Sequence, residues 1–114
     1  MMDDKIEAYY ALKPAKYGFL EELSISQTVD PKAWRGLVLA VTLRSSEESV
    51  RGVMRLEFWG VRNLKVNSFD GLMRYGIDIR SISEDQLEGL KYRVTENEHA
   101  LLSFVCDAFS AQVE

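Results

Sequence analysis

The sequence has very few of the side chains that bind metals or form disulfides. Its 114 residues include one cysteine, Cys106, and one histidine, His99. A single cysteine excludes an intrachain disulfide, and one thiolate with one imidazole cannot complete a structural zinc site. The seven glycines are scattered and form no phosphate-binding loop. We therefore expect no metal, no cofactor and a reduced, cytoplasmic setting for the chain.

Long apolar runs and an excess of positive charge are also missing. The longest apolar stretch falls far short of the roughly 20 residues of a transmembrane helix, and the start Met1-Met2-Asp3-Asp4 does not resemble a signal peptide. The net charge of −4 disfavours non-specific binding to nucleic acid or to an anionic membrane, and it suits a basic protein partner. The length predicts a single domain over residues 1–114.

What the sequence does contain is a series of short alternating segments. In residues 37–44 and 53–59, apolar side chains alternate with other side chains, which is the period of a strand with one buried face. Further strands are expected at 61–66, 90–95 and 102–113, and a first strand is marked by Phe19, Leu23 and Ile25. The pattern predicts an α+β, mainly β fold: an antiparallel meander of about six or seven strands, curled into a half-barrel or a sandwich.

Two breaks in the alternation predict irregularities within strands. Gly60 interrupts the pattern of residues 53–66 and predicts a bulge. A slip of phase at Asp107-Ala108 predicts a bulge, or a bend of the last strand from one face to another.

Asp70-Gly71 is typical of a tight hairpin, because both residues tolerate the positive φ of a two-residue turn. Such a turn would place Val66 opposite Tyr75 and would make the segments on either side of it neighbours in the sheet. A single helical turn is expected at residues 83–89.

The start of the chain predicts a short helix, which Asp3 or Asp4 caps and Pro14 ends. A helix of this length is marginal alone and must dock one side on the sheet. The side chains expected to dock are Ile6, Tyr9 and Tyr10.

Candidates for catalysis are weak. Cys106 lies in an alternating segment, where a thiol is a small buried apolar group, and His99 lies in a polar loop. Adjacent carboxylates such as Glu47-Glu48 point apart on a strand or are solvated in a loop, so they do not converge as an acid and a base. We therefore expect no catalytic residue and no enzyme activity.

Basic side chains fall on the polar faces of the predicted strands; they are Arg55, Arg62, Lys65, Arg74, Lys91 and Arg93. If neighbouring strands align them, they form a basic stripe for RNA or an acidic partner. The favoured alternative is cross-strand ion pairing with Glu57 and Asp78. Trp59 points away from Phe58 toward the same faces, either covered by the helix or exposed as a contact residue.

Three stretches carry a resemblance to a known family: residues 17–25 (YGFLEELSI), 54–64 (MRLEFWGVRNL) and 102–106 (LSFVC). Together they resemble small bacterial β-rich immunity proteins found beside polymorphic toxins. Many members of that family carry a His-Asp pair where this chain has Leu20-Glu21, so a role for that pair does not transfer. The resemblance implies a binding role without enzyme activity.

The leading hypothesis is therefore a protein-binding module, an immunity protein that neutralises a toxin by steric occlusion. Its candidate contact residues are Trp59, Arg62, Glu96 and Glu98. An alternative is a small-ligand-binding or enzymatic half-barrel whose pocket uses Tyr75, Tyr92 and Arg93. A third alternative is a homodimer formed through an uncovered sheet face or edge.

Overall fold

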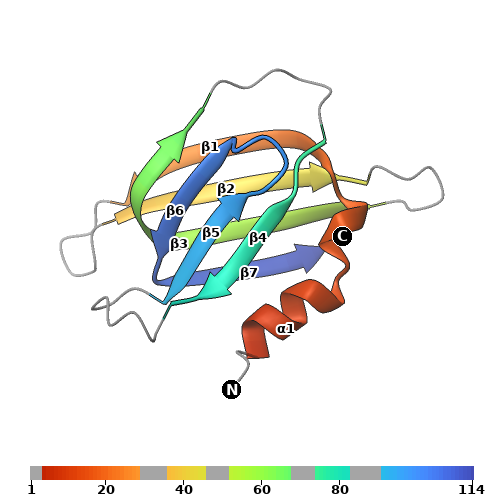
Figure 1. The fold of residues 1–114 in the computed structure, drawn as a ribbon, viewed down its shortest axis with the longest axis horizontal. Coiled ribbons are helices and arrows are strands. Elements are labelled where there is room, and N and C mark those ends of the chain that lie inside the picture. The colour runs from red at the N-terminus through yellow and green to blue at the C-terminus, as the bar shows by residue number, and fades with distance from the viewer. Residues whose placement is uncertain (1–3, 29–35, 46–51, 68–73, 83–90) are drawn as a thin grey trace.

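The computed structural model describes residues 4–28, 36–45, 52–67, 74–82 and 91–114 (Figure 1). It begins with the helix α1 (Asp4–Ala11) and the 3₁₀ helix η1 (Pro14–Lys16). The strands that follow are β1 (Phe19–Thr28), β2 (Gly36–Arg44), β3 (Val53–Val66), β4 (Ile77–Ser81), β5 (Tyr92–Glu96), β6 (Leu102–Cys106) and β7 (Ala108–Val113). All the strand pairs are antiparallel, which confirms the predicted mainly β class with a short N-terminal helix.

The long strand β3 belongs to two layers of the sheet. Its first half pairs with β2 and β7, whereas its second half pairs with β6. In Figure 1, β4, β5 and β6 cross in front of β1, β2, β3 and β7. Because Asp107 alone separates β6 from β7, these two strands pass from one layer to the other beside β3. The phase slip at Asp107-Ala108 indicated this bend correctly.

The strand order is β1-β2-β3-β6-β5-β4, with β7 on β3. It contains two three-strand meanders, β1-β2-β3 and β4-β5-β6, and β3 is hydrogen-bonded to β6 rather than to β4. The expected pairing of Val66 with Tyr75 is therefore wrong, because Val66 is opposite Leu102. The Asp70-Gly71 turn and the helical turn at 83–89 lie outside the described residues.

The sheet curls until its two ends approach each other at one point. Phe19, at the start of β1, forms an isolated bridge with Arg74, and the backbone N–H of Tyr75 donates to the carbonyl of Gly18 at 2.8 Å. On the other side, α1 lies beside β4 and β7 (Figure 1), where Lys5 Nζ donates to the carbonyl of Phe109 at 3.2 Å. The predicted curled sheet is thus present.

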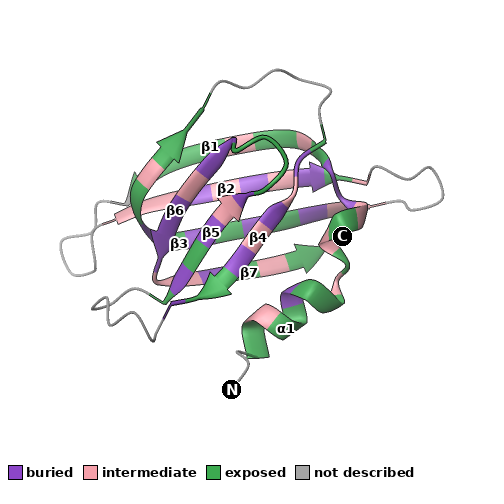
Figure 2. Cartoon of the chain, in the orientation of Figure 1, coloured by how far each residue is buried: buried purple, intermediate pink, exposed green. Residues whose placement is uncertain are grey.

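The core lies between the two layers (Figure 2). The Phe58 ring packs edge-on against Phe104 with centroids 4.9 Å apart, and Tyr92 packs against Phe109 at 4.8 Å. Cys106 is fully buried among them, as predicted. Burial raises the pKa of its thiol to about 12, and the charge of Asp107 adds to this effect.

The first strand and the helix show where simple periodicity was misleading. β1 is present, but Phe19 and Ile25 are 45% and 48% exposed. A bulge between Leu20 and Glu22 shifts the phase and places Phe19 opposite the exposed Arg44. Ile25 is opposite the buried Leu39 but remains exposed because β1 lies at the end of the sheet. In α1, Tyr9 is buried and Ile6 is partly buried, whereas Tyr10 remains 42% exposed. No helix in the described part of the chain is long and apolar enough to cross a membrane.

Candidate partner-binding surface

Two bulges turn Arg62 and Lys65 of β3 to the outer surface, as Trp59 is before them. Residues three apart on a regular strand point to opposite faces. Gly60 has no partner on β2, since Val61 pairs with Leu37 and Trp59 with Val38. This extra residue shifts the phase and turns Arg62 outward.

The second bulge repeats the shift three residues later. Asn63 and Leu64 together face a single residue of β6, because Arg62 pairs with Val105 and Lys65 with Ser103. Gly60 and Asn63 adopt positive φ values of 72° and 57°, which glycine and asparagine tolerate better than other residues. Lys65 is therefore exposed on the same side as Arg62.

The strand register aligns these residues with basic side chains of β4 and β5. Arg62 is opposite Val105, Val105 is opposite Arg93, and Arg93 is opposite Arg80. We call the exposed side chains of Arg62, Lys65, Arg80 and Arg93 the basic face. Val105 points to the same side but is buried, and the two arginines that flank it have long apolar stems that can cover it.

A hollow of about 310 Å³ lies within the basic face. Lys65 and Arg93 border it, together with Asn63, and Ser103 and Val105 contribute to its lining. It therefore combines cations with amide and hydroxyl groups that can donate hydrogen bonds.

The expected cross-strand ion pairs with Glu57 and Asp78 do not form among the described residues. Asp78 Oδ2 instead lies 3.1 Å from Nε of Arg80, two residues away on the same strand, and in the described part of the chain no carboxylate forms an ion pair with Arg62, Lys65 or Arg93. Glu57, which was expected to share their face, lies on the other layer opposite Ala40.

The other predicted basic residues lie elsewhere. Arg55 belongs to the layer of β2 and β7 and pairs with Glu114 at 3.5 Å. Arg74 donates to the carbonyl of Ala15 beside η1, and Lys91 is exposed just before β5. The stripe therefore forms from only part of the predicted set.

Glu96 ends β5 with its carboxylate inside the molecule, only 3% exposed. It accepts hydrogen bonds from the backbone N–H groups of Gly76 (2.9 Å), Glu98 (2.7 Å), His99 (2.8 Å) and Leu101 (3.0 Å). Burial acts to raise the pKa of Glu96, but these bonds stabilise the anion more strongly and the pKa is lowered. The carboxylate thus holds together the turn that carries the exposed Glu98.

A groove of about 420 Å³ lies between η1 and the start of β4. Its lining includes Tyr10, Lys13, Arg74, Asp78 and Glu98, so charges of both signs border it. This mixture distinguishes the groove from the basic face, where the cations are in excess.

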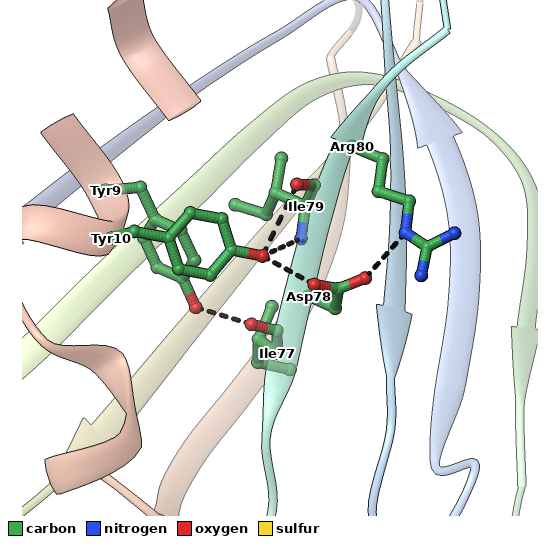
Figure 3. Close-up of polar contacts among 6 residues, drawn as sticks. All are labelled: Tyr9, Tyr10, Ile77, Asp78, Ile79 and Arg80. Atoms are coloured by element: carbon green, nitrogen blue, oxygen red, sulfur yellow. Dashed lines mark hydrogen bonds and ion pairs between the residues drawn. The ribbon is translucent and has the colours of Figure 1, made fainter. Parts of the chain in front are cut away.

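Two tyrosines of α1 bind the open edge of β4 (Figure 3). Tyr9 Oη donates to the carbonyl of Ile77 at 2.7 Å, and Tyr10 Oη accepts from the N–H of Ile79 at 3.2 Å and donates to Asp78. Burial raises the pKa of both phenols, so they remain neutral donors. The helix thereby satisfies backbone groups that a neighbouring strand would otherwise bind.

We expect Tyr9→Phe to be more destabilising than Tyr10→Phe. The first change leaves the carbonyl of Ile77 without its donor in a buried site, at a cost of about 1–3 kcal/mol. The second removes bonds to Asp78 and Ile79 from a Tyr10 side chain that is 42% exposed. Urea unfolding of both variants measures the difference. Equal losses would show that the buried bond contributes no more than the exposed ones.

Residues 1–112 match the model of a family described as immunity protein PIM8. The chain belongs to this family of immunity proteins. The resemblance inferred from the three sequence stretches is confirmed. Searches of curated proteins and of solved structures found no match.

In the structure of this immunity protein, the four candidate contact residues lie at two separate places. Trp59, 36% exposed, and Arg62 lie at the bend of β3. Glu96 and Glu98 lie at the turn between β5 and β6, at the end of β6 that begins with Leu102. The partner-contact role of all four stays a prediction.

The alternative pocket of Tyr75, Tyr92 and Arg93 does not form in this immunity protein. Tyr92 and Arg93 are consecutive on β5, so one side chain points into the core and the other outward. Tyr75 is also buried, and its ring packs edge-on against His99 at 5.5 Å. In the described part of the chain, no three His, Cys, Asp or Glu side chains are grouped to hold a metal ion.

Sequence reasoning missed the contribution of Arg80 and the second bulge that aligns Lys65. Arg80 could not be assigned a neighbour while β4 was expected beside β3. A signal for this bulge was present, since Asn63, three residues after Gly60, marks a second position that tolerates positive φ.

Proposed function

We propose that this protein is a non-catalytic immunity protein that neutralises a bacterial toxin by binding it and covering its active surface. The observation that carries the proposal is the family match over residues 1–112. The exposed basic face supports it, because the backbone of paired strands is already ordered before binding and loses little conformational entropy on contact.

Trp59 and Arg62 are the contacts that we propose for the centre of the interface. Tryptophan and arginine are the residue types most enriched at binding hot spots. Glu98 is a proposed contact at the far turn, and Glu96 contributes by holding that turn in place through its internal hydrogen bonds.

Steric neutralisation is favoured over chemical inactivation by the state of Cys106. A nucleophilic cysteine needs exposure and a lowered pKa. The Cys106 thiol is fully buried and its pKa is raised to about 12. We propose that the encounter takes place in the bacterial cytoplasm, where a free thiol remains reduced.

The proposal predicts that a toxin domain is encoded beside the gene for this chain, and co-expression with that domain tests the proposal. We expect cells to grow when both proteins are made and to die when the toxin is made alone. Calorimetry of the purified proteins should give a one-to-one complex. Death of cells that accumulate both proteins, with no heat of binding, would contradict the proposal.

The same complex distinguishes steric occlusion of the toxin from its chemical modification. Toxin released from the complex by denaturation and refolded should have its original mass and its full activity. A changed mass, or a toxin that stays inactive after release, would show that this protein modifies its partner.

A further inference from the structure

We infer that the basic face binds a carboxylate-rich surface of the toxin domain, with one partner carboxylate seated in the hollow between Lys65 and Arg93. The inference rests on the proposed function, since it names the chemistry of the surface that this protein covers. The partner is assigned from local charge, although the net charge of −4 alone would suit a basic protein.

The first support is that two bulges in β3 align the cations on one face. Without the bulges at Gly60 and Asn63, the alternation of β3 would turn Arg62 or Lys65 into the core. Bulges re-aim side chains and are common next to functional sites. Trp59, 36% exposed, precedes the first bulge and lies in the layer of β2 and β7.

The second support is that the cations are placed where they repel one another. Arg93 is directly opposite Arg80, and like charges opposite each other across strands are destabilising. Asp78 relieves this only in part, because it pairs with Arg80 and not with Arg93. Carboxylates of a partner would pair with these arginines and remove the repulsion, which makes the free energy of binding more favourable.

The third support is the form of the hollow. Its volume of about 310 Å³ exceeds that of a single acidic side chain, and Lys65, Arg93, Asn63 and Ser103 surround it with hydrogen-bond donors. Arginine can bind a carboxylate through two parallel hydrogen bonds, which adds orientation to the attraction.

A protein partner fits this face better than a single-stranded nucleic acid. Such nucleic acids are bound by a basic track interleaved with aromatic side chains on which the bases stack. Among the described residues lining the hollow, the one aromatic side chain is Phe104, which is buried in the core. The negative net charge also opposes a long phosphate backbone.

The test compares two double charge reversals that change the net charge equally. Lys65→Glu with Arg93→Glu alters the basic face, and the control, Arg44→Glu with Arg55→Glu, alters exposed cations away from it. By calorimetry with the purified toxin domain, we expect the first variant to weaken binding by about 100-fold and the control by less than about threefold. Melting curves establish that both variants fold.

Each result with the toxin leads to a decision. Wild-type binding that the reversal at Lys65 and Arg93 leaves unchanged would overturn the inference while the proposed function stands. Equal weakening in both variants would also overturn it, because net charge and not this face would then govern affinity. Failure of the wild-type protein to bind the toxin would reject the proposed function itself.

In that last case a second probe decides the chemistry of the face. A poly-glutamate peptide added at low salt should shift the amide resonances of Lys65, Arg93 and Ser103, and the charge reversals should abolish these shifts. Absence of the shifts, or tighter binding of a single-stranded RNA oligonucleotide than of the peptide, would overturn the assignment to a carboxylate-rich protein.

Discussion

Replacing Glu96 with alanine should lower the free energy of unfolding by about 3–5 kcal/mol, which is among the largest effects of a polar substitution. The carboxylate accepts four backbone hydrogen bonds and is nearly inaccessible to water. Its removal leaves buried N–H groups without an acceptor. Glu96→Gln should lose about 2–3 kcal/mol, because an amide group has one oxygen and turns its own donors toward these N–H groups.

Urea unfolding followed by circular dichroism measures these losses. Glu98→Ala is the matched control, since Glu98 is exposed in the same turn, and its effect should stay within about 0.5 kcal/mol. If Glu96→Ala and Glu98→Ala proved equally mild, the four hydrogen bonds would not stabilise the turn.

The same carboxylate should make stability depend on pH. Its pKa in the folded protein is lowered from the ordinary value of 4.5. The stabilisation is therefore complete above about pH 5 and is lost as the pH falls through the folded-state pKa. Glu96→Gln should remove this part of the acid sensitivity, so the wild-type and variant unfolding free energies should converge in acid. A constant difference between them would contradict the lowered pKa.

The second large effect is expected for Phe58→Ala, at about 3–5 kcal/mol. Phe58 is fully buried, and its ring contacts Phe104 of the facing layer and lies 6.2 Å from the ring of Phe109. Its truncation leaves a cavity where β3 joins the two layers, and the surrounding strands cannot collapse fully into it.

Ile25→Ala on β1 is the control for the Phe58 substitution, because Ile25 is exposed and its loss should cost less than about 1 kcal/mol. Denaturant unfolding of both variants gives the comparison. Toxin affinity per folded molecule should be unchanged in Phe58→Ala, since the side chain points away from the basic face. A loss below 1 kcal/mol would show that the two layers are held together by other contacts.

Several features of this protein followed from local sequence patterns. Alternation located the strands, because the period of two is a property of each segment by itself. The same reasoning placed Cys106 in the core and a bulge at Gly60, where the glycine tolerates a positive φ. The helix and its buried Tyr9 were also predicted from neighbouring residues.

Local patterns could not predict which distant segments contact one another. Any apolar alternating segment can pair with any other, so the Asp70-Gly71 turn was a poor guide to the neighbour of β3. Glu96 looks like a solvated loop residue in the sequence, and only the convergence of four N–H groups makes its burial favourable.

For the candidate surface, too, one part followed from the sequence and another only from the tertiary structure. The sequence by itself determined that this is a mainly β immunity protein with exposed cations on its strands. The tertiary structure decided which of them act together, because strand order sets Arg80, Arg93 and Arg62 in one row. The alignment of Lys65 depended on a bulge that β3 shows only when it is paired with β6, since the extra residue exists relative to a partner strand.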